Sequence, residues 1–461
     1  MRSNEKHLDL RGFLETLEAD DPDCVLRIPG KVGLEFDVTA VAMELERQGR
    51  SPVIRFEKVG DSPFPVVTNL FGDRQRYARA LGVAEEELIE TWADLGEKTM
   101  EPVLLETGPI LDVVNTGADV DLTALPILNH FAEDGGRYVT NGIVIAKDPD
   151  TGVRNASYHR LQVMGNTRFG TSLHSRRHLW NYAERAAARN ERIPVSIVIG
   201  HHPLFAFGSG LWKGPIHVDE YAVTGGFMGQ PLELVEGVTV PVEAPAYAEF
   251  VLEGHIVPGE QVLEGPFAEF TGYASARSTQ HVIEVTAVLH RKDAIYQDIV
   301  SGISDEHTGL LAIPMEARLL KVLRQNYPNV TRVAMPKSGT CRMHVYIAMK
   351  DPAPGQAKNA AAAALGEDLS LKLAVVVDDD VEISRDQDVM WALCTRMQAD
   401  VDIDILKNCM GAILDPSNHD GLTAKMIIDA TKPASGDFPP RHTVPEEAAA
   451  RARLLIETYA G

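Results

Sequence analysis

The spacing of apolar residues changes twice along this chain of 461 residues, and these two changes constrain the fold more than any other feature. Helices and strands alternate over residues 1–110, short strands separated by turns dominate residues 111–305, and alternation returns over residues 306–435. We therefore predict an α+β chain of several domains, which is long enough to bury separate cores. Residues 436–461 predict a loop and a last helix, a candidate dimer contact.

The first region predicts an α/β domain. Helical periodicity and runs rich in β-branched residues alternate there. The expected helices cover residues 9–19 and 37–48, and the expected strands cover residues 51–59 and 64–72. Residues 73–96 predict two short helices interrupted at Gly82.

The middle region predicts an antiparallel barrel. Residues 135–170 are strands cut by turn residues, and Asp-Pro-Asp-Thr-Gly at 148–152 is a hairpin signal. One helical stretch interrupts the pattern at residues 176–194. The strand pattern continues over residues 220–237, 245–260 and 278–300.

The third region predicts a second α/β domain. Residues 371–381 form a continuous apolar run that ends in aspartates, which is typical of a buried parallel strand. The expected helices around it cover residues 309–330, 357–367 and 386–398.

Charge and cysteine content exclude several functions. The net charge of −22 argues against nucleic acid as a partner, because a phosphate backbone requires a basic face. The four cysteines lie far apart, at 24, 341, 394 and 409, so they support neither a zinc knuckle nor a disulfide framework. There is no apolar run long enough to cross a bilayer and no apolar signal core at the N-terminus, so we expect a cytoplasmic protein without a membrane partner.

Residues 155–165, Asn-Ala-Ser-Tyr-His-Arg-Leu-Gln-Val-Met-Gly, predict a strand with an arginine in it. On one strand Tyr158 and Arg160 would share a face, and Ser157 and His159 would share the other. A buried Arg160 would need a carboxylate or a phosphate as its partner. The alternative is an arginine at the barrel rim that pairs with any nearby acid.

Other polar residues carry weaker signals when taken singly. His174 and His178 have the spacing of two zinc ligands on a helix, but the intervening arginines would repel a cation and the rest of a zinc motif is missing. Glu220 lies on an expected strand and, taken singly, is predicted to be an exposed acid. Lys425 lies near the end of an apolar run and is predicted to extend its charged end into solvent.

Residues 263–274 carry two glutamates, Glu264 and Glu269, around a Gly-Pro turn that excludes a continuous helix. An arginine beside two carboxylates makes a proton-transfer unit. The acid that pairs with the arginine stays ionised, and the other, near aromatic rings, has its pKa raised toward the working pH. A solvated loop is the alternative.

Taken together, these segments resemble the UbiD family of reversible decarboxylases over nearly the whole chain. Residues 155–165 are similar to the family's Asn-x-x-x-x-Arg strand, and residues 264–273 to its Glu-Gly-Pro-x-Gly-Glu/Asp turn, with Ala268 in place of the usual glycine. Residues 220–231 resemble its Glu-Tyr-x-x-x-Gly-x-x-x-Gly-x-Pro segment. Residues 373–398 and 424–431 resemble its C-terminal hallmarks.

The resemblance implies a flavin-binding split β-barrel that holds prenylated FMN, with Mn²⁺ (or Mg²⁺) and K⁺ at its phosphate. A separate flavin prenyltransferase would supply the cofactor. By position, Asn155, His178 and Glu220 would bind the metal. The further cofactor contacts implied are Ser157, Tyr158, His159, Arg160, Arg177 and Lys425, with Lys425 at the phosphate.

The resemblance also implies the chemistry. Arg160 would pair with Glu264 beside the reactive ring, and the Gly-Pro turn would leave Glu269 facing the substrate as the proton donor. A carboxylic acid would form a covalent adduct with the prenylated flavin, CO2 would leave, and Glu269 would protonate the carbon. Residues 304–317 resemble the branch that acts on aromatic or heteroaromatic acids of the hydroxybenzoate, indole, pyrrole or furan type. A homodimer or a larger homo-oligomer is implied.

Two other functions stay open at this stage. One is an FMN-dependent oxidoreductase, although no convincing dinucleotide-binding glycine motif is present. The other is a non-catalytic family member acting as an assembly subunit, which would be expected to have lost Arg160, Glu264 or Glu269. Whether His174 or His307 contributes to the site, and in which direction the reaction runs, also stay open.

Overall fold

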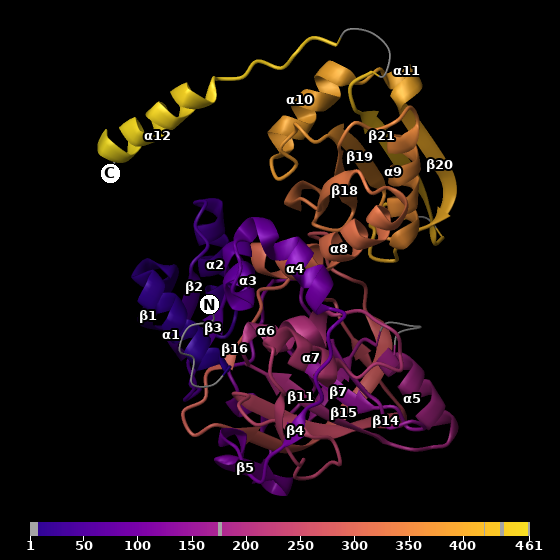
Figure 1. Ribbon diagram of the computed structural model, residues 1–461. Coiled ribbons are helices and arrows are strands. Elements are labelled where there is room, and N and C mark those ends of the chain that lie inside the picture. Colours follow the sequence, from indigo (N-terminus) through magenta and orange to yellow (C-terminus); the bar gives the residue numbers. More distant parts are fainter. Residues whose placement is uncertain (1–7, 174–177, 419, 434–437, 460–461) are drawn as a thin grey trace.

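A computed structural model describes residues 8–173, 178–418, 420–433 and 438–459. Figure 1 shows N-terminal helices and strands packed beside a large central sheet, with a C-terminal α/β unit above them. The last helix, α12 (Glu446–Tyr459), lies apart from the other elements. The predicted α+β class with a central antiparallel sheet is confirmed.

The N-terminal region consists of short helices around a small sheet. Its helices are α1 (Leu10–Asp20), α2 (Asp37–Arg47), α3 (Arg74–Leu81) and α4 (Leu88–Leu95), and its strands are β1 (Val25–Val32), β2 (Val53–Val59) and β3 (Val66–Thr68). Gly82 ends α3 with a left-handed φ of 72°, which confirms the predicted break between two helices. A distant strand, β16 (Tyr296–Gln297), completes this sheet by pairing in parallel with β3.

The central sheet is antiparallel throughout, with neighbours in the order β6-β9-β10-β15-β14-β11-β7-β8 and β5 beside β15. Its strands are β5 (Val113–Thr116), β6 (Tyr138–Val139), β7 (Ile143–Lys147), β8 (Arg154–Tyr158), β9 (Leu161–Val163), β10 (Arg168–Thr171), β11 (Ile193–Ile199), β14 (Phe250–Glu264) and β15 (Ser278–His290). A smaller sheet contains β4 (Val103–Leu104), β12 (Glu233–Val235) and β13 (Ala244–Pro245).

The connection between β8 and β9 shows that this sheet curls into a half-barrel. These strands are separated only by His159 and Arg160, yet β8 lies at one end of the strand order and β9 lies next to the other end. Such a connection spans at most about 11 Å, so the two ends of the sheet must approach each other. The single strand expected over residues 155–165 is therefore wrong. It is two strands, and Arg160 lies at the seam between them.

Glu220 begins a helix, α7 (Glu220–Met228), where the strand pattern was expected to continue. Asp219 caps this helix by accepting a hydrogen bond from the Tyr221 amide at 2.9 Å, and Gly229 ends it with a φ of 68°. All residues of α7 are buried. A helix that is buried on every side has no polar face, so its sequence shows no helical periodicity.

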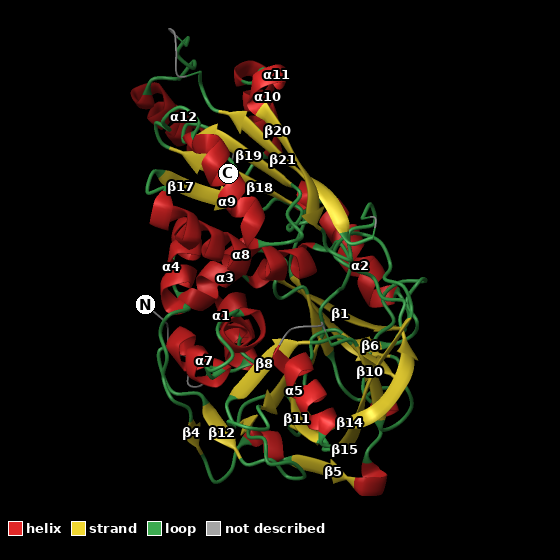
Figure 2. Ribbon diagram, turned by 90° about the vertical axis from the view of Figure 1, so that its right-hand side faces the viewer, coloured by secondary structure: helices red, strands yellow, loops and turns green. Residues whose placement is uncertain are grey.

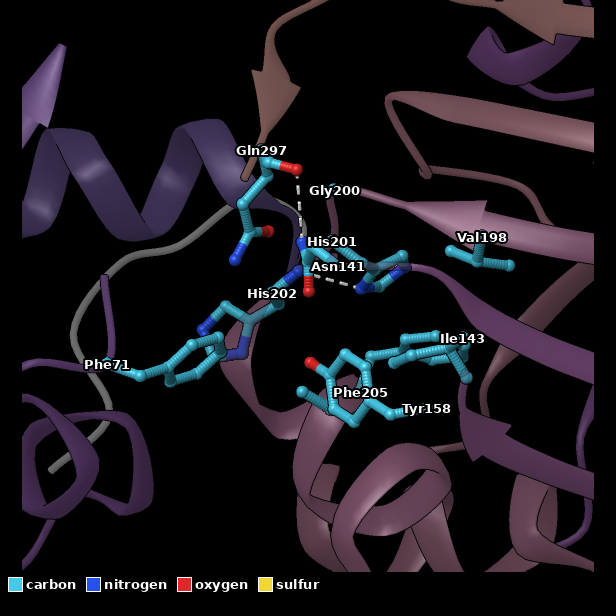
Figure 3. Close-up of a pocket in the computed structure, with 11 residues that line it drawn as sticks. Phe71, Asn141, Ile143, Tyr158, Val198, Gly200, His201, His202, Phe205 and Gln297 are labelled. Carbon is cyan, nitrogen blue, oxygen red and sulfur yellow. Dashed lines mark hydrogen bonds between the residues drawn. The ribbon is translucent and has the colours of Figure 1, made fainter. Parts of the chain in front are cut away.

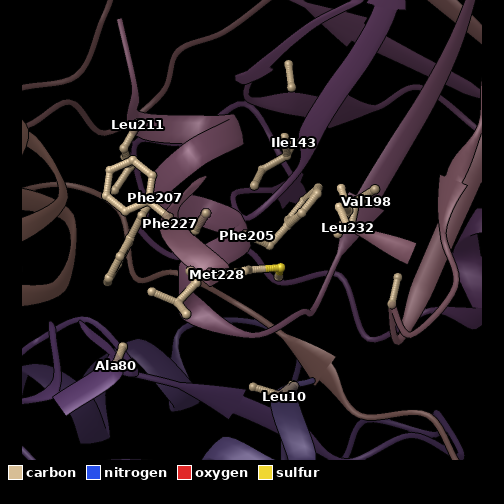
Figure 4. Close-up of a cluster of buried hydrophobic side chains, with 14 of the residues drawn as sticks. Leu10, Ala80, Ile143, Val198, Phe205, Phe207, Leu211, Phe227, Met228 and Leu232 are labelled. Atoms are coloured by element: carbon tan, nitrogen blue, oxygen red, sulfur yellow. The ribbon is translucent and has the colours of Figure 1, made fainter. Parts of the chain in front are cut away.

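Buried apolar residues join the N-terminal helices to the half-barrel, and Figure 4 shows Leu10 and Ala80 of these helices in one cluster with Phe207. The short helix α6 (Pro203–Phe205) continues into a π-helical turn, η6 (Ala206–Leu211). The fully buried ring of Phe207 lies 4.5 Å from Trp92 and 5.4 Å from Tyr77, centroid to centroid. Burying such a ring stabilises the fold by roughly 1.5–3 kcal/mol. The N-terminal helices thereby hold η6 in place against β8.

The C-terminal region is an α/β unit with the strand order β17-β18-β19-β21-β20. Its elements are α8 (Asp305–Asn326), β17 (Val330–Ala334), β18 (His344–Met349), α9 (Gln356–Glu367), β19 (Leu373–Asp378), α10 (Asp386–Arg396), α11 (Ala399–Asp402), β20 (Ile403–Met410) and β21 (Leu422–Ala430). β19 pairs in parallel with both β18 and β21, which confirms the predicted buried parallel strand.

Figure 2 shows α3, α4 and α8 between the half-barrel and the C-terminal sheet. The long helix α8 therefore links all three regions. In the part of the chain that the structure describes, no helix is both long enough and apolar enough to cross a membrane.

Candidate active site

Arg160 and Glu264 form a buried, doubly hydrogen-bonded ion pair at the seam of the half-barrel. Arg160 Nε and Nη2 each donate to one oxygen of Glu264, both at 2.9 Å. The Glu264 side chain is fully buried, and that of Arg160 is 14% exposed. Despite the opposing effect of burial, the carboxylates beside Arg160 hold its pKa above the ordinary value. Arg160 is thus a largely buried, paired arginine and not an exposed residue at the rim.

Aromatic groups complete the surroundings of this pair. The hydroxyl of Tyr138 donates to Glu264 Oε1 at 3.1 Å. The guanidinium carbon of Arg160 lies 5.0 Å from the centre of the Phe267 ring, in cation–π geometry. Glu264 therefore accepts three hydrogen bonds, and Arg160 is confined between a carboxylate and a ring.

The chain reverses direction directly after Glu264. Gly265 has a φ of 96°, a conformation that side-chain-bearing residues rarely adopt. The Gly265 amide donates to Gln162 Oε1 at 3.0 Å, and Arg277 Nε donates to the Gly265 carbonyl at 3.0 Å. The turn is therefore held on both sides by side chains from β9 and from the segment before β15.

Glu269 is carried back to Arg160 by this turn. Its carboxylate accepts a hydrogen bond from Arg160 Nη1, so both glutamates contact the arginine. The expectation that Glu269 is free of Arg160 is wrong for this structure. Burial raises the pKa of Glu269 above that of an ordinary glutamate, and the charge of Arg160 opposes the rise. Phe267 and Phe270 beside it are buried, whereas Tyr273 is exposed.

A polar face of β8 lies close to the same seam. Ser157 Oγ donates to Asn155 Oδ1 at 3.4 Å and lies 2.9 Å from His159 Nε2. These three alternate residues share one face, as the alternation of a strand predicts. Three side chains that were selected from the sequence thus come together.

Asn155 also meets His178 and Glu220. Asn155 Nδ2 lies 3.0 Å from Glu220 Oε1 and 3.4 Å from His178 Nδ1, and His178 Nδ1 lies 3.8 Å from Glu220 Oε1. These residues come from β8 and from the first turns of α5 (His178–Ala188) and α7. The structure thus brings together three residues that are up to 65 positions apart in the sequence.

The chemistry of this group suits a divalent cation. Glu220 is buried, and its Oε2 has no hydrogen-bond partner among the described residues. Burial raises the pKa of Glu220 above its ordinary value. A buried carboxylate oxygen without a partner is costly, and a cation would satisfy it. Oxygen donors from Asn155 and Glu220 together with one imidazole suit Mn²⁺ or Mg²⁺ better than a thiolate-binding metal.

One predicted cofactor contact, Lys425, lies in the C-terminal region. Lys425, on β21, donates from Nζ to the carbonyls of Leu365 and Asp368 at 2.6 and 3.0 Å, at the C-terminal end of α9. Its contact with a phosphate stays a prediction. Arg177 and His174 lie outside the described residues.

His307, in the first turn of α8, is positioned through Gly302. Its Nδ1 lies 2.9 Å from the Gly302 carbonyl. A side chain on Gly302 would lie 3.8 Å from Ala268, the residue before Glu269. Burial lowers the pKa of His307, so the imidazole is neutral near pH 7. The loop that holds His307 therefore packs against the turn that carries Glu269.

Comparison with known proteins decides the family. The sequence matches the domains of 3-octaprenyl-4-hydroxybenzoate carboxy-lyase in their natural order. The N-terminal domain matches residues 16–95, the Rift-related domain residues 103–304 and the C-terminal domain residues 308–430. This chain belongs to the UbiD family. It is therefore a carboxy-lyase. Membership argues against the oxidoreductase, and the presence of Arg160, Glu264 and Glu269 argues against the non-catalytic assembly subunit.

Solved UbiD-class structures share the whole fold. The enzyme HmfF from Pelotomaculum thermopropionicum, in complex with FMN, is 38% identical with a TM-score of 0.89, over 96% of this chain and 98% of that one. An evolved dimeric form of HmfF, in complex with prFMN, is 36% identical with a TM-score of 0.86, over the same 96% and 98%. The predicted fold is confirmed by these matches.

Two relatives are decarboxylases that act on different acids. Anhydromevalonate phosphate decarboxylase from Methanothermobacter thermautotrophicus is 33% identical over 427 residues, or 92% of this chain and 97% of the relative. Phenolic acid decarboxylase from Sedimentibacter hydroxybenzoicus is 32% identical over 456 residues, or 94% of each. The reaction class is thus shared among relatives whose substrates differ.

Within this UbiD-family fold, Tyr158 faces away from the polar side of β8. It lines a pocket together with Phe71, Phe205 and both His201 and His202 (Figure 3). Its hydroxyl is buried without a hydrogen-bond partner among the described residues. The ring packs on η6, because a side chain on Gly210 would lie 2.5 Å from it. A contact between Tyr158 and the cofactor stays a prediction.

Sequence reasoning missed several residues of this candidate site. Tyr138 and Gln162 hydrogen-bond to Glu264 and Gly265, and neither has a motif that marks it. The π-helical turn η6 was also missed, although its sequence Phe-Gly-Ser-Gly is a local signal. Its glycines permit close approach, since a side chain on Gly208 would lie 2.4 Å from Thr224 in α7. π-Helical turns are frequent at functional sites.

Proposed function

We propose that this protein catalyses the reversible, non-oxidative decarboxylation of an aromatic or heteroaromatic carboxylic acid, with Glu269 as the proton donor. The observation that carries the proposal is the arrangement of Glu269, Arg160 and Glu264. A nearly buried carboxyl group with a raised pKa lies beside a buried arginine–carboxylate pair. A proton donor that works near neutral pH needs such an environment.

Prenylated FMN is the cofactor that we propose, because relatives of the same fold bind FMN and prFMN. When bound, it supplies a covalent electron sink that allows CO2 to leave. Asn155, His178 and Glu220 would hold Mn²⁺ or Mg²⁺, and Ser157 and His159 would extend the polar face toward the cofactor. K⁺ and a phosphate contact from Lys425 or Arg177 belong to the same proposal.

The residues of this chain perform the remaining tasks. Arg160 presents its guanidinium at the seam, where it can orient a carboxylate, and Glu264 with Tyr138 fixes the plane of that guanidinium. Phe267 and Phe270 exclude water around Glu269. Glu269 then donates its proton to the carbon that has lost CO2. In the carboxylation direction the same carboxylate removes that proton.

An aromatic substrate is favoured by the buried rings at the site and by the relatives that act on phenolic acids. His307 would contact a ring heteroatom or hydroxyl, because its Nδ1 is engaged by Gly302 and the imidazole is neutral. The anhydromevalonate phosphate decarboxylases suggest a second candidate, a phosphorylated unsaturated acid. Both classes belong in one substrate screen.

A second copy of the chain is the partner that we propose for α12. Its apolar side chains are exposed, with Leu454 63%, Ile456 63% and Tyr459 81% accessible. An isolated amphipathic helix is marginal in water and gains stability by burying its apolar side. An evolved form of HmfF is dimeric, which supports a homodimer as compatible with this fold.

The test is to co-express the protein with a flavin prenyltransferase, supply Mn²⁺, and examine it by native mass spectrometry and visible absorption. A bound prenylated FMN, followed by CO2 release from aromatic acids, would support the proposal. The matched variant Glu269→Gln should retain the cofactor and lose turnover. If protein that was loaded in this way releases no CO2 from any acid of either class, the proposal is wrong.

A further inference from the structure

The segment Asp134–Tyr138 runs beside the turn that carries Glu269 and contacts it at successive positions. Asp134 Oδ1 accepts a hydrogen bond from the Ala268 amide at 2.8 Å. The Gly135 amide donates to the Pro266 carbonyl at 2.8 Å. The Tyr138 hydroxyl, which also contacts Glu264, donates to the same carbonyl at 3.1 Å. The segment therefore holds the turn from Glu264 to Ala268.

The two segments lie close together, and the side chain of Gln162 bridges them. A side chain on Gly135 would lie 2.3 Å from the Gly265 carbonyl oxygen, so only glycine fits there. Gln162 joins both segments, because its Nε2 donates to the Gly135 carbonyl at 2.7 Å and its Oε1 accepts from the Gly265 amide at 3.0 Å. The first half of the turn is therefore fixed by backbone contacts and by one buried amide.

The second half of the turn, where Glu269 lies, depends on Asp134. The remaining backbone bonds of Glu269 are internal to the turn, since its amide donates to the Tyr273 carbonyl and its carbonyl accepts from the Gly272 amide, both at 3.0 Å. Such bonds close the turn but do not place it relative to Arg160. Asp134 does place the turn. One oxygen of its carboxylate accepts a hydrogen bond from the amide of Ala268, directly before Glu269, and the other oxygen accepts one from the Phe131 amide at 3.0 Å.

We propose that Asp134 is a positioning residue for the proton donor, whose carboxylate fixes the backbone at Ala268 and thereby holds Glu269 beside Arg160. This inference rests on the proposed function of Glu269. Asp134 contacts a backbone amide and not the carboxyl group of Glu269, so it acts through the position of the turn. A carboxylate suits this role, since both of its oxygens accept from amides at once.

The charge of Asp134 adds a second effect. The charged groups that act on Glu269 are Arg160, which lowers its pKa, and Glu264 and Asp134, which raise it. Loss of the Asp134 charge should therefore move the pKa of Glu269 down. Asp134→Asn keeps the size of the side chain and one acceptor oxygen but removes the charge, whereas Asp134→Ala removes both.

The experiment compares Asp134→Ala and Asp134→Asn with Glu133→Gln, which removes an exposed charge at the adjacent position. Each protein is loaded with prenylated FMN and Mn²⁺, and its cofactor content is checked by visible absorption. Hydrogen exchange of peptides spanning residues 266–275 reports the turn directly. Steady-state kinetics with the best acid from the screen report kcat, KM and the pH profile of kcat.

We expect faster exchange in this peptide and a kcat lower by about 10- to 100-fold in Asp134→Ala, because small displacements of catalytic groups have effects of that size. The cofactor content and KM should change less than twofold. Asp134→Asn should lose less activity, and the alkaline limb of its kcat profile should move to lower pH. Glu133→Gln should match the wild type throughout.

Two results would overturn the inference. One is an Asp134→Ala enzyme with cofactor content and kcat like the wild type. The other is a loss of kcat without faster exchange over residues 266–275, which would show that Asp134 acts by another route. Failure of the proposed function gives a different result, because the wild type itself then releases no CO2. In that case, unchanged hydrogen exchange over residues 266–275 in Asp134→Ala would still refute the role of the hydrogen bond between Asp134 and Ala268.

Discussion

Replacement of Arg160 by methionine tests the central claim that this arginine and Glu264 form one buried unit. Methionine fills a similar volume but offers no hydrogen-bond donor. Glu264, whose side chain is fully buried, would lose two hydrogen bonds of 2.9 Å and keep only the bond from Tyr138 at 3.1 Å. A buried carboxylate that has lost its cation destabilises the folded state.

The magnitude follows from the burial of the pair. Breaking a buried ion pair by removing one partner costs about 3–5 kcal/mol. For a unit of 150–250 residues, 1 kcal/mol corresponds to about 2–4 °C in Tm, so Arg160→Met should lower the Tm by roughly 6–20 °C. The double variant Arg160→Met/Glu264→Leu should recover part of this loss, because it leaves no unpaired buried charge at Glu264, whereas Glu269 still lacks its bond from Arg160.

The assay is thermal unfolding of the cofactor-free proteins at pH 7, followed by circular dichroism, for the wild type, both single variants and the double variant. Cofactor-free protein is required because a bound ligand would shift the Tm by itself. A matched surface variant, Arg47→Met, removes an exposed arginine whose partner Glu44 is also exposed, and it should change the Tm by no more than about 1 °C. If Arg160→Met unfolds within 2 °C of Arg47→Met, the reasoning about the buried pair is refuted.

Three further predictions concern the donor, the metal and α12. Glu269→Gln should lower kcat by about 10²- to 10⁴-fold in a CO2-release assay. Because burial raises the pKa of Glu269, the protonated donor should persist to higher pH than an ordinary glutamate, and kcat should fall as pH rises through that pKa; a pH-independent kcat would contradict this. Glu220→Ala should lose bound manganese by elemental analysis, whereas the exposed Glu236→Ala should keep it. Ile456→Asp should convert dimers to monomers in light scattering, and an unchanged mass would argue against α12 as the contact.

Local patterns in the sequence were sufficient for elements with a clear period or cap. The helix break at Gly82 and the buried parallel strand over Leu373–Asp378 were both predicted, because one is decided by a left-handed glycine and the other by a run of apolar residues. The helix α7 was missed since all of its residues are buried. The sequence shows a helical or strand period only where an element has both a solvent-exposed and a buried side.

In the candidate site, too, the sequence predicts some features and not others. Arg160, Glu264 and Glu269 were selected from their residue types, the Gly-Pro turn and the resemblance of their segments to a known family, and these are properties of neighbouring residues in the chain. The pairing of Arg160 with Glu264 was expected from that resemblance, but the further contact of Arg160 with Glu269 was not, because it depends on how closely the turn approaches the seam. Likewise, Asn155, His178 and Glu220 meet only through the packing of α5 and α7 against β8.

The sequence by itself therefore determined the order of the regions, the residues able to carry out acid–base chemistry and the family to which they point. Only the tertiary structure decided that β8 lies at one end of the sheet and β9 next to the other end, and that Arg160 lies where those ends meet. It also decided that Asp134 and Gln162, which no motif marks, hold the turn of Glu269. The physical reason is that strand order and close approach arise from contacts between residues far apart in the chain, and no local pattern encodes them.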